Sequence, residues 1–208
     1  MKRFAIILLS GFMMIFSVFC EESKEESEFD KIMSHIYFPS DFGLAIPTNS
    51  NIKPGITGKT SVEWRFKPLQ SVFCIFEYND TSFDYSDLQA EGSNLLSGSV
   101  NYSDFLLGAG YRFNFAENWC TAFSLMGGIS NCTYGTIVKD GSYYQTDSIS
   151  KWIPAVKANL MLEYYFDPAF GIYISAGYKQ YLKNTVYTSG LSKEGNAEFS
   201  IGMTSTLW

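Results

Sequence analysis

The feature that most constrains this chain is a run in which large apolar residues alternate with small or polar ones, stop for three residues and then resume. The run is "LLGAGYRFNFAENWCTAFSLMGG", residues 106–128, and its break is at Ala116, Glu117 and Asn118. Successive side chains on a strand point to opposite faces, so period-two alternation predicts a strand with two different environments. We therefore predict a hairpin, whose arms of about 14 residues are roughly twice the usual length of a globular strand.

Each arm of this hairpin has one apolar row and one mixed row. In the first arm the apolar row is Ser103, Phe105, Leu107, Ala109, Tyr111, Phe113 and Phe115, and the mixed row is Tyr102, Asp104, Leu106, Gly108, Gly110, Arg112 and Asn114. In the second arm the apolar row is Trp119, Thr121, Phe123, Leu125, Gly127 and Ile129, opposite Cys120, Ala122, Ser124, Met126, Gly128 and Ser130.

The same pattern recurs along the chain. "SVEWRF" and "SVFCIFEY" are joined by residues 67–70, and "AVKANLMLEYYF" and "FGIYISAGYKQY" are joined by residues 167–169, both breaks having proline in a turn context. A first, weaker strand runs from about Ile36 to Ile46, where Pro39 would remove a ladder hydrogen bond. A final strand runs from Gly195 to Leu207, which completes eight.

Between these hairpins lie longer links, at residues 47–59, 80–97, 134–150 and 183–194. Long and short links therefore alternate, as expected of a membrane barrel with short periplasmic turns and long extracellular loops. No segment after residue 20 resembles a membrane helix, and only helices and closed barrels satisfy backbone hydrogen bonds in hydrocarbon. We predict one domain over residues 36–208, an all-β, closed, eight-stranded antiparallel up-and-down transmembrane β-barrel with short periplasmic turns and longer extracellular loops.

Charge placement agrees with this fold, because the apolar rows carry no Asp, Glu, Lys or Arg. A charge facing lipid near the bilayer midplane would cost about 2–4 kcal/mol. We predict that the charged rows face the lumen, with these members: Asp41, Glu63, Arg65, Lys67, Glu77, Asp104, Arg112, Lys151, Lys157, Glu163, Lys179 and Glu198. A soluble lipocalin-like barrel would invert the two rows, and the charge pattern alone does not separate the two folds. Link asymmetry, strand length and aromatic placement favour the membrane.

Aromatic residues bunch beside the short turns, with a second group near the long links. Amphipathic rings at bilayer interfaces form two such belts. The predicted interface aromatics are Trp64, Phe66, Tyr111, Phe113, Phe115, Trp119, Trp152, Tyr164, Phe166, Phe170 and Tyr178.

The N-terminus reads as a secretory signal peptide over residues 1–20, with Lys2 and Arg3 before an apolar run that ends near Cys20. Lipidation of Cys20 and retention of the run as a membrane helix remain open alternatives. We predict that residues 21–35 are an acidic, flexible N-terminal segment. Of the other cysteines, Cys120 and Cys132 lie on one predicted strand, roughly 40 Å apart, so they cannot pair with each other.

The net charge of -6 offers no basic stripe, so we expect no nucleic-acid partner. The chain has no close Cys/His cluster, and we expect neither a metal nor a cofactor. The partners we expect are outer-membrane lipid, the barrel-insertion machinery, and a small solute or surface ligand whose identity stays open.

Two strands carry motifs that resemble the small outer-membrane barrels of the OmpW-type family. "LLGAGYRFNF" is similar to their recurrent Gly-x-Gly-Tyr-x-Phe strand, and "WIPAVKANLMLEYYF" to a proline-started strand that ends in aromatics. Such proteins also end in an aromatic residue preceded by alternating apolar residues as an assembly signal. Here that signal would be Phe199, Ile201, Met203, Leu207 and Trp208, with Trp208 one step out of phase.

Three functions follow as hypotheses. The OmpW resemblance implies a narrow passage for small, possibly apolar, molecules across the outer membrane, and small inward residues such as Gly108, Gly110 and Gly202 could leave it open. Alternatively, the predicted charges could form a structural plug, and tyrosine-rich extracellular loops could bind a surface partner. Catalysis is the third, and we do not expect it, because His35 stands apart from any motif.

Overall fold

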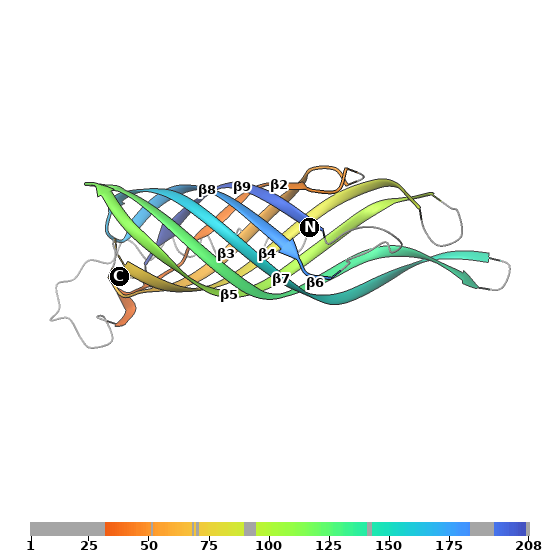
Figure 1. Cartoon of the computed structure of the whole chain (residues 1–208), viewed down its shortest axis with the longest axis horizontal. Coiled ribbons are helices and arrows are strands. Elements are labelled where there is room, and N and C mark those ends of the chain that lie inside the picture. Colours follow the sequence, from red (N-terminus) through yellow and green to blue (C-terminus); the bar gives the residue numbers. More distant parts are fainter. Residues whose placement is uncertain are drawn as a thin grey trace, which may run out of the picture.

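The structure, a computed structural model, describes residues 32–50, 52–67, 69, 71–89, 95–140, 143–183 and 194–206. Its strands are β1 (Ile36–Tyr37), β2 (Ser40–Pro47), β3 (Gly55–Arg65), β4 (Ser71–Gln89), β5 (Leu95–Ala116), β6 (Trp119–Asp140), β7 (Tyr143–Asp167), β8 (Phe170–Tyr181) and β9 (Gly195–Ser205). From β2 onward each strand pairs antiparallel with the next, and β9 pairs back onto β2 (Figure 1). Because β1 and β2 share one place in the wall beside β3, the ring has eight positions, and the predicted fold class is confirmed.

The two rows of each strand lie as predicted for a membrane barrel. The Leu107 side chain is 66% exposed on the outer wall, whereas Arg112 on the same strand is 1% exposed and faces the interior. On β8, Ile172 and Ile174 are exposed and Tyr173 is buried. The inverted, lipocalin-like arrangement is therefore wrong for this chain, because its apolar rows cover the outside.

The short turns are stabilised by side chains that bond to nearby backbone. The Asp167 carboxylate accepts the backbone N–H groups of Ala169 and Phe170, at 2.7 and 2.9 Å. This is the local bonding that makes aspartate a turn residue. The hydroxyl of Ser71 similarly bonds the backbone N–H and C=O of Lys67, each at 2.9 Å. The end of the barrel that carries these turns is called the short-turn end.

The predicted first strand is divided into β1 and β2 at Pro39, where the sequence predicted the loss of a ladder hydrogen bond. Residues 38 and 39 belong to no strand, and β1 pairs with the last residues of β3 whereas β2 pairs with its first half. Pro39 has no N–H to donate, but its carbonyl accepts the backbone N–H of Ser61 at 2.8 Å. Tyr37 is buried and stays in phase across the break with the buried Asp41 of β2.

The predicted long loops at 80–97 and 134–150 are wrong in their conformation, because most of their residues are strand. β4 runs to Gln89 and β5 starts at Leu95, while β6 and β7 are separated only by residues 141 and 142. Pairing of β6 with β7 continues to Asp140 and Tyr143, although pairing of β7 with β8 stops at Ala155 and Tyr181. The sequence of residues 135–148 carries no regular apolar alternation, which is why this part of the two strands was predicted as a link.

The β4–β5 and β6–β7 hairpins therefore project past the ring, on the side opposite the short turns (Figure 1). This side is called the hairpin end. The predicted link at 47–59 is also shorter in the structure, because β2 runs to Pro47 and β3 starts at Gly55. Within the described ranges, no helix is both long and apolar enough to cross a membrane.

The predicted signal peptide, Cys20 and most of the acidic segment lie outside the described residues. Residues 32–35, the last of that segment, contact the short-turn end: the Thr206 hydroxyl bonds the carbonyl of Met33 at 3.3 Å, and His35 Nδ1 lies 2.6 Å from the carbonyl oxygen of Arg65.

Candidate functional site

The barrel interior is the candidate site, because it gathers the charged rows of the sequence. Ten of the twelve predicted lumen charges are buried there: Asp41, Glu63, Arg65, Glu77, Asp104, Arg112, Lys157, Glu163, Lys179 and Glu198. They divide into clusters at different heights, and most of their ion pairs join strands that are not neighbours in the wall.

The cluster nearest the short turns is built on two arginines. Arg112 on β5 lies between two carboxylates, with Nε 2.5 Å from Glu163 on β7 and Nη2 3.1 Å from Glu63 on β3. Arg65 on β3 pairs with Glu63 at 2.9 Å and donates to the hydroxyl of Tyr165 at 2.7 Å. The guanidinium carbon of Arg65 also lies 3.5 Å from the ring centroid of Tyr37. This Arg65–Arg112 cluster, capped by Tyr37, fills the short-turn end.

A second cluster lies farther along the interior and is built on two lysines. Lys157 on β7 contacts Glu77 at 2.7 Å and Glu198 at 2.6 Å. Lys179 on β8 contacts Glu198 at 2.7 Å and Asp104 at 2.5 Å. Glu198 on β9 therefore bridges both ammonium groups. We call this group the Lys157–Lys179 cluster.

Sequence reasoning missed two buried charges, Glu194 just before β9 and Lys59 on β3. The Lys59 ammonium lies 2.9 Å from Asp41 and donates to the hydroxyl of Ser175 at 3.0 Å. The predicted link at 47–59 ends on Lys59. The signal for Lys59 was present nonetheless, since Lys59 is in phase with Ser61, Glu63 and Arg65, the inward row of the same strand.

Two predicted lumen charges are not inside, and this corrects the prediction. Lys67 is exposed in the turn after β3, which ends at Arg65. Lys151 is exposed because its part of β7 lies beyond the last pair with β8, although it stays in phase with the buried Ile153. Its ammonium lies 5.8 Å from the ring centroid of Tyr134. In both cases the residue keeps the inward phase of its strand but lies beyond the closed ring, where no interior is enclosed.

The small inward residues do not leave open space in front of them. A Cβ placed on Gly110 would contact the ring of Phe73, and one on Gly202 would lie 2.8 Å from the ring carbon Cζ of Tyr173. Large neighbouring side chains thus occupy the volume that glycine vacates. Over the described residues, aromatic rings and paired charges fill the interior.

At the hairpin end the interior becomes apolar and aromatic. Tyr102 and Tyr181 stack with ring centroids 4.5 Å apart, and Phe83 packs edge-on against Tyr102 at 6.0 Å. Just above, the hydroxyl of Tyr85 on β4 donates to the carbonyl of Gly135 on β6 at 3.3 Å, across the intervening strand β5. The phenol of Tyr85 passes over Gly98, where a Cβ would lie 2.7 Å from its oxygen. This contact ties the bases of the two hairpins together.

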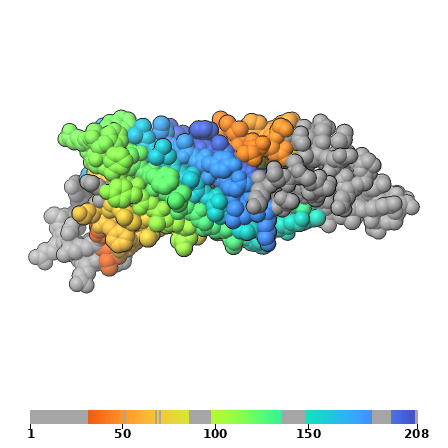
Figure 2. All heavy atoms as spheres, viewed as in Figure 1, coloured from red at the N-terminus to blue at the C-terminus, as the bar shows by residue number. Residues whose placement is uncertain are grey.

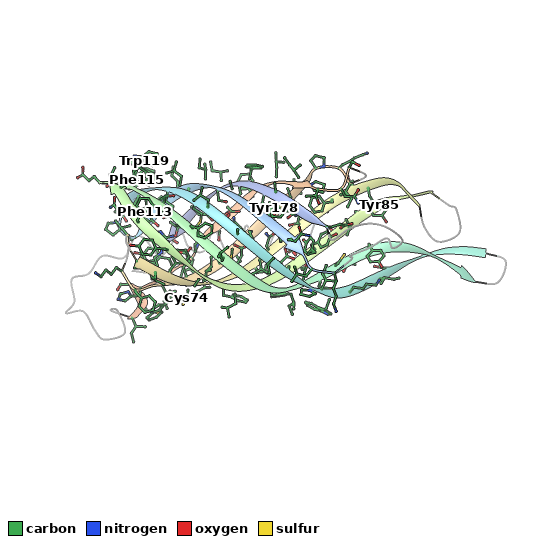
Figure 3. The ribbon with its side chains drawn as sticks, in the orientation of Figure 1. Cys74, Tyr85, Phe113, Phe115, Trp119 and Tyr178 are labelled. Carbon is green, nitrogen blue, oxygen red and sulfur yellow. The ribbon has the colours of Figure 1, made fainter. Side chains whose placement is uncertain are left out.

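The predicted interface aromatics lie on the outer wall. Nine are exposed, and Tyr164 and Phe170 are partly exposed. Near the short turns Trp119 packs on Tyr164 at 5.1 Å, and Phe166 stacks on Phe170 at 5.7 Å. Figure 3 shows Phe113, Phe115 and Trp119 together at that end. On the hairpin side, Phe105 lies between Tyr78 at 5.1 Å and Trp152 at 6.1 Å.

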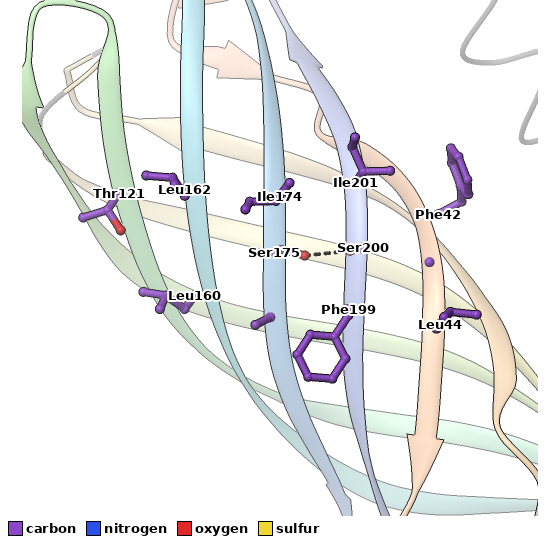
Figure 4. A pocket seen from close by; sticks show the side chains of 12 residues that line it. Phe42, Leu44, Thr121, Leu160, Leu162, Ile174, Ser175, Phe199, Ser200 and Ile201 are labelled. Carbon is purple, nitrogen blue, oxygen red and sulfur yellow. Dashed lines mark hydrogen bonds between the residues drawn. The ribbon is translucent and has the colours of Figure 1, made fainter.

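The outer wall forms a continuous side-chain surface over β5 to β8 (Figure 2). A groove of about 700 Å³ lies in the outer wall, lined mainly by outward apolar residues of β7, β8, β9 and β2 (Figure 4). Leu160, Ile174 and Phe199 stand around the small Ala176. The lining also includes the inward residues Ser175 and Ser200, and Ser175 accepts a hydrogen bond from Lys59.

The remaining predicted residues are placed as follows. Phe199, Ile201 and Met203 of the assembly signal are exposed on the outer wall, and Leu207 and Trp208 lie outside the described residues. Cys74 is exposed, whereas Cys120 and Cys132 are buried, and all three are free thiols. Within the described ranges, no three His, Cys, Asp or Glu side chains gather closely enough to hold a metal ion.

No protein-family model and no curated protein matches this chain. Its fold does match solved eight-stranded outer-membrane barrels. The neisserial surface protein NspA is 13% identical with a TM-score of 0.55, over 82% of this chain and 96% of NspA. The Yersinia pestis attachment invasion locus protein Ail, solved with the heparin analogue sucrose octasulfate, is 16% identical with a TM-score of 0.51, over 82% of this chain and 97% of Ail. At these identities the likeness establishes the fold.

Proposed function

We propose that this chain is exported through its N-terminal signal and resides in the outer membrane, where its long hairpins bind a partner outside the cell. In this orientation the short turns face the periplasm, as in other barrels whose loops differ in length at the two ends. The exposed apolar rows then contact lipid, and the aromatic groups lie at the two interfaces.

The observation that carries the proposal is the extension of four strands beyond the ring. β6 and β7 stay paired from Ile129–Pro154 to Asp140–Tyr143, with no pairing of β8 to that part of β7. β4 and β5 extend likewise to Gln89 and Leu95. The Tyr85–Gly135 hydrogen bond fixes their bases against each other. A paired ribbon held at its base presents a more ordered surface than a loose loop of the same length, which lowers the entropy lost on binding.

The composition of the hairpins suggests the kind of partner. Residues 134–150 contain three tyrosines and several serines and glycines, residues that suit recognition surfaces. Residues 80–97 contain Asp80, Asp84, Asp87 and Glu91 and no Lys or Arg. A negative surface favours a partner with basic or neutral groups and disfavours polyanions. The fold is shared with Ail, which binds a sulfated heparin analogue, but these charges point to a different ligand class.

The filled interior supports a role outside the barrel. The Arg65–Arg112 and Lys157–Lys179 clusters both cross it, and opening a route would separate buried ion pairs, which costs several kcal/mol for each uncompensated charge. The second candidate function is the narrow passage that the OmpW-type resemblance of residues 106–115 and 152–166 implies. Such a passage requires the two clusters to rearrange. We propose membership of the OmpW-type family only as part of this second candidate function.

Two variants test the binding role. One replaces residues 137–148 by an Asn-Gly turn, and the other is the triple substitution D84N, D87N and E91Q, which keeps the hairpin length. Cells that display each variant are assayed for attachment to host cells and to extracellular matrix. We expect the first variant to lose most attachment and the second to weaken it in a salt-dependent manner.

The matched control is Glu117→Gln, an exposed acid at the short-turn end, which we expect to leave attachment unchanged. Heat-dependent gel migration shows whether each variant is a folded barrel. Folded variants that attach as well as the unaltered chain would contradict the proposal.

A further inference from the structure

A small cavity lies at the hairpin end of the interior, where β2 ends and β9 begins. Its polar lining comes from Asn49, Tyr102, Tyr181, Glu194 and Asn196, and Ile52 and Phe83 contribute apolar surface. About 10 Å³ of it is open to the centre of a water-sized group. This volume admits one water molecule or a single group of that size. We call it the mouth cavity.

The walls of the mouth cavity are fixed by bonds around it. The Tyr102 hydroxyl donates to a carboxylate oxygen of Glu194 at 2.8 Å, and the Tyr102 ring stacks on Tyr181 at 4.5 Å. The backbone N–H of Tyr181 donates to the Glu194 carbonyl at 2.9 Å. The Thr48 hydroxyl and backbone N–H, between the lining residues Pro47 and Asn49, both donate to the Gly195 carbonyl, at 3.0 and 2.8 Å. These contacts hold the polar groups in place before any ligand arrives.

Two buried side chains of the lining have hydrogen-bonding atoms with no partner among the described residues. These atoms are the hydroxyl oxygen of Tyr181 and both the Nδ2 and Oδ1 atoms of Asn196. Each side chain belongs to a residue that is 1% exposed. A buried polar group without a hydrogen bond costs about 1–3 kcal/mol. The arrangement therefore calls for a guest that supplies the missing bonds.

The chemistry of the lining restricts the guest. Asn196 Oδ1 needs a donor and Nδ2 needs an acceptor, so the guest must do both. An ammonium group only donates and a carboxylate only accepts, and Glu194 further disfavours an anion. A hydroxyl group both donates and accepts hydrogen bonds. It is about the size of a water molecule, so it could take the place of a bound water and keep the same hydrogen bonds.

We propose that the mouth cavity binds one hydroxyl group of a neutral saccharide. A lining that combines aromatic rings with a few convergent polar groups is typical of sites for small polar ligands. This inference rests on the proposed function only in one respect: the saccharide would reach the cavity from outside the cell if the hairpin end faces outward. Binding by the chain in detergent tests the cavity itself.

The test titrates the chain, purified in detergent, with methyl glucoside and separately with glycerol. We expect a saturable shift of the side-chain amide signals of Asn196 in NMR spectra, with methyl glucoside binding more tightly than glycerol. Calorimetry then compares variants: Asn196→Leu should weaken methyl glucoside binding by about tenfold or more. The control Asn101→Leu changes an exposed asparagine of β5 and should leave binding unchanged.

Three results would overturn the proposal: no saturable shift with either probe, equal binding by the Asn196→Leu variant, or binding of methylammonium or acetate in place of the hydroxyl probes. Should Asn196→Leu fail to fold, Tyr181→Phe gives the same comparison, because it removes one hydroxyl and keeps the stacked ring. Loss of this site would leave the hairpin proposal standing, since residues 137–148 do not line the cavity.

Discussion

The ammonium group of Lys157 on β7 lies 2.7 Å from a carboxylate oxygen of Glu77 on β4, across the interior of the barrel. β5 and β6 separate these strands in the wall, so the contact spans the lumen and does not join neighbours. The same ammonium lies 2.6 Å from Glu198 on β9. One lysine thus links three parts of the wall and occupies the centre of any straight passage.

Substitution of Lys157 by Met should destabilise the barrel strongly. Removal of one partner leaves Glu77 and Glu198 buried with less compensating charge, which costs about 3–5 kcal/mol. Lys67→Met is the matched control, because Lys67 is exposed in a turn and its loss should change stability by less than about 0.5 kcal/mol. Urea unfolding in lipid vesicles measures both. Equal stabilities for the two variants would show that the Lys157–Lys179 cluster does not stabilise the fold.

The free-energy cost of placing a charged side chain on the outer wall should depend on how deep in the bilayer the residue lies. Leu107 lies near the middle of β5 and is 66% exposed, so Leu107→Arg should cost about 2–4 kcal/mol in a bilayer. Phe115 lies at the short-turn end of the same strand, and Phe115→Arg should cost about 0–1 kcal/mol. Folding free energies in vesicles give the comparison. If Phe115→Arg cost as much as Leu107→Arg or more, the wall would not be embedded as described.

Cys74 offers a direct report on which face meets lipid. It is an exposed free thiol on β4, in the outward row (Figure 3). With the other cysteines replaced by alanine, a nitroxide label on Cys74 in vesicles should be relaxed more by dissolved oxygen than by a water-soluble nickel complex. A label introduced by Lys67→Cys, in the turn, should show the reverse. Stronger relaxation by nickel at Cys74 would place that row against water.

Period-two alternation predicted the strands and their two rows, and link asymmetry, strand length and aromatic placement predicted which row faces outward. The alternation works within the membrane because lipid and interior impose different chemistry on the two faces, as for Phe105 and Asp104. It fails at the edges of the ring. Lys67 and Lys151 keep the inward phase but lie past the strand pairs that enclose an interior. Residues 80–85 are strand although they were predicted as a link, and there the alternation was present, since Phe83 and Tyr85 are buried on either side of the exposed Asp84.

The ion pairs themselves could not be predicted from the sequence. Which charges meet across a barrel depends on strand tilt and stagger, which a pattern along one strand does not contain. Lys157 and Glu77 are 80 residues apart in the chain, and their contact exists only because the ring closes with this stagger. The inward position of Lys59, unlike its ion pair, could have been predicted by extending the inward row of β3 by two residues.

The central claim is that the barrel is closed by its own side chains and that its function lies in the hairpins outside it. Single-channel recording of the folded chain, inserted in a planar bilayer, tests the closure most directly. We predict that inserted protein, verified by heat-dependent gel migration, gives no discrete conductance steps, because the Arg65–Arg112 and Lys157–Lys179 clusters both cross the interior. Reproducible steps from the same preparation would contradict this account and favour the passage.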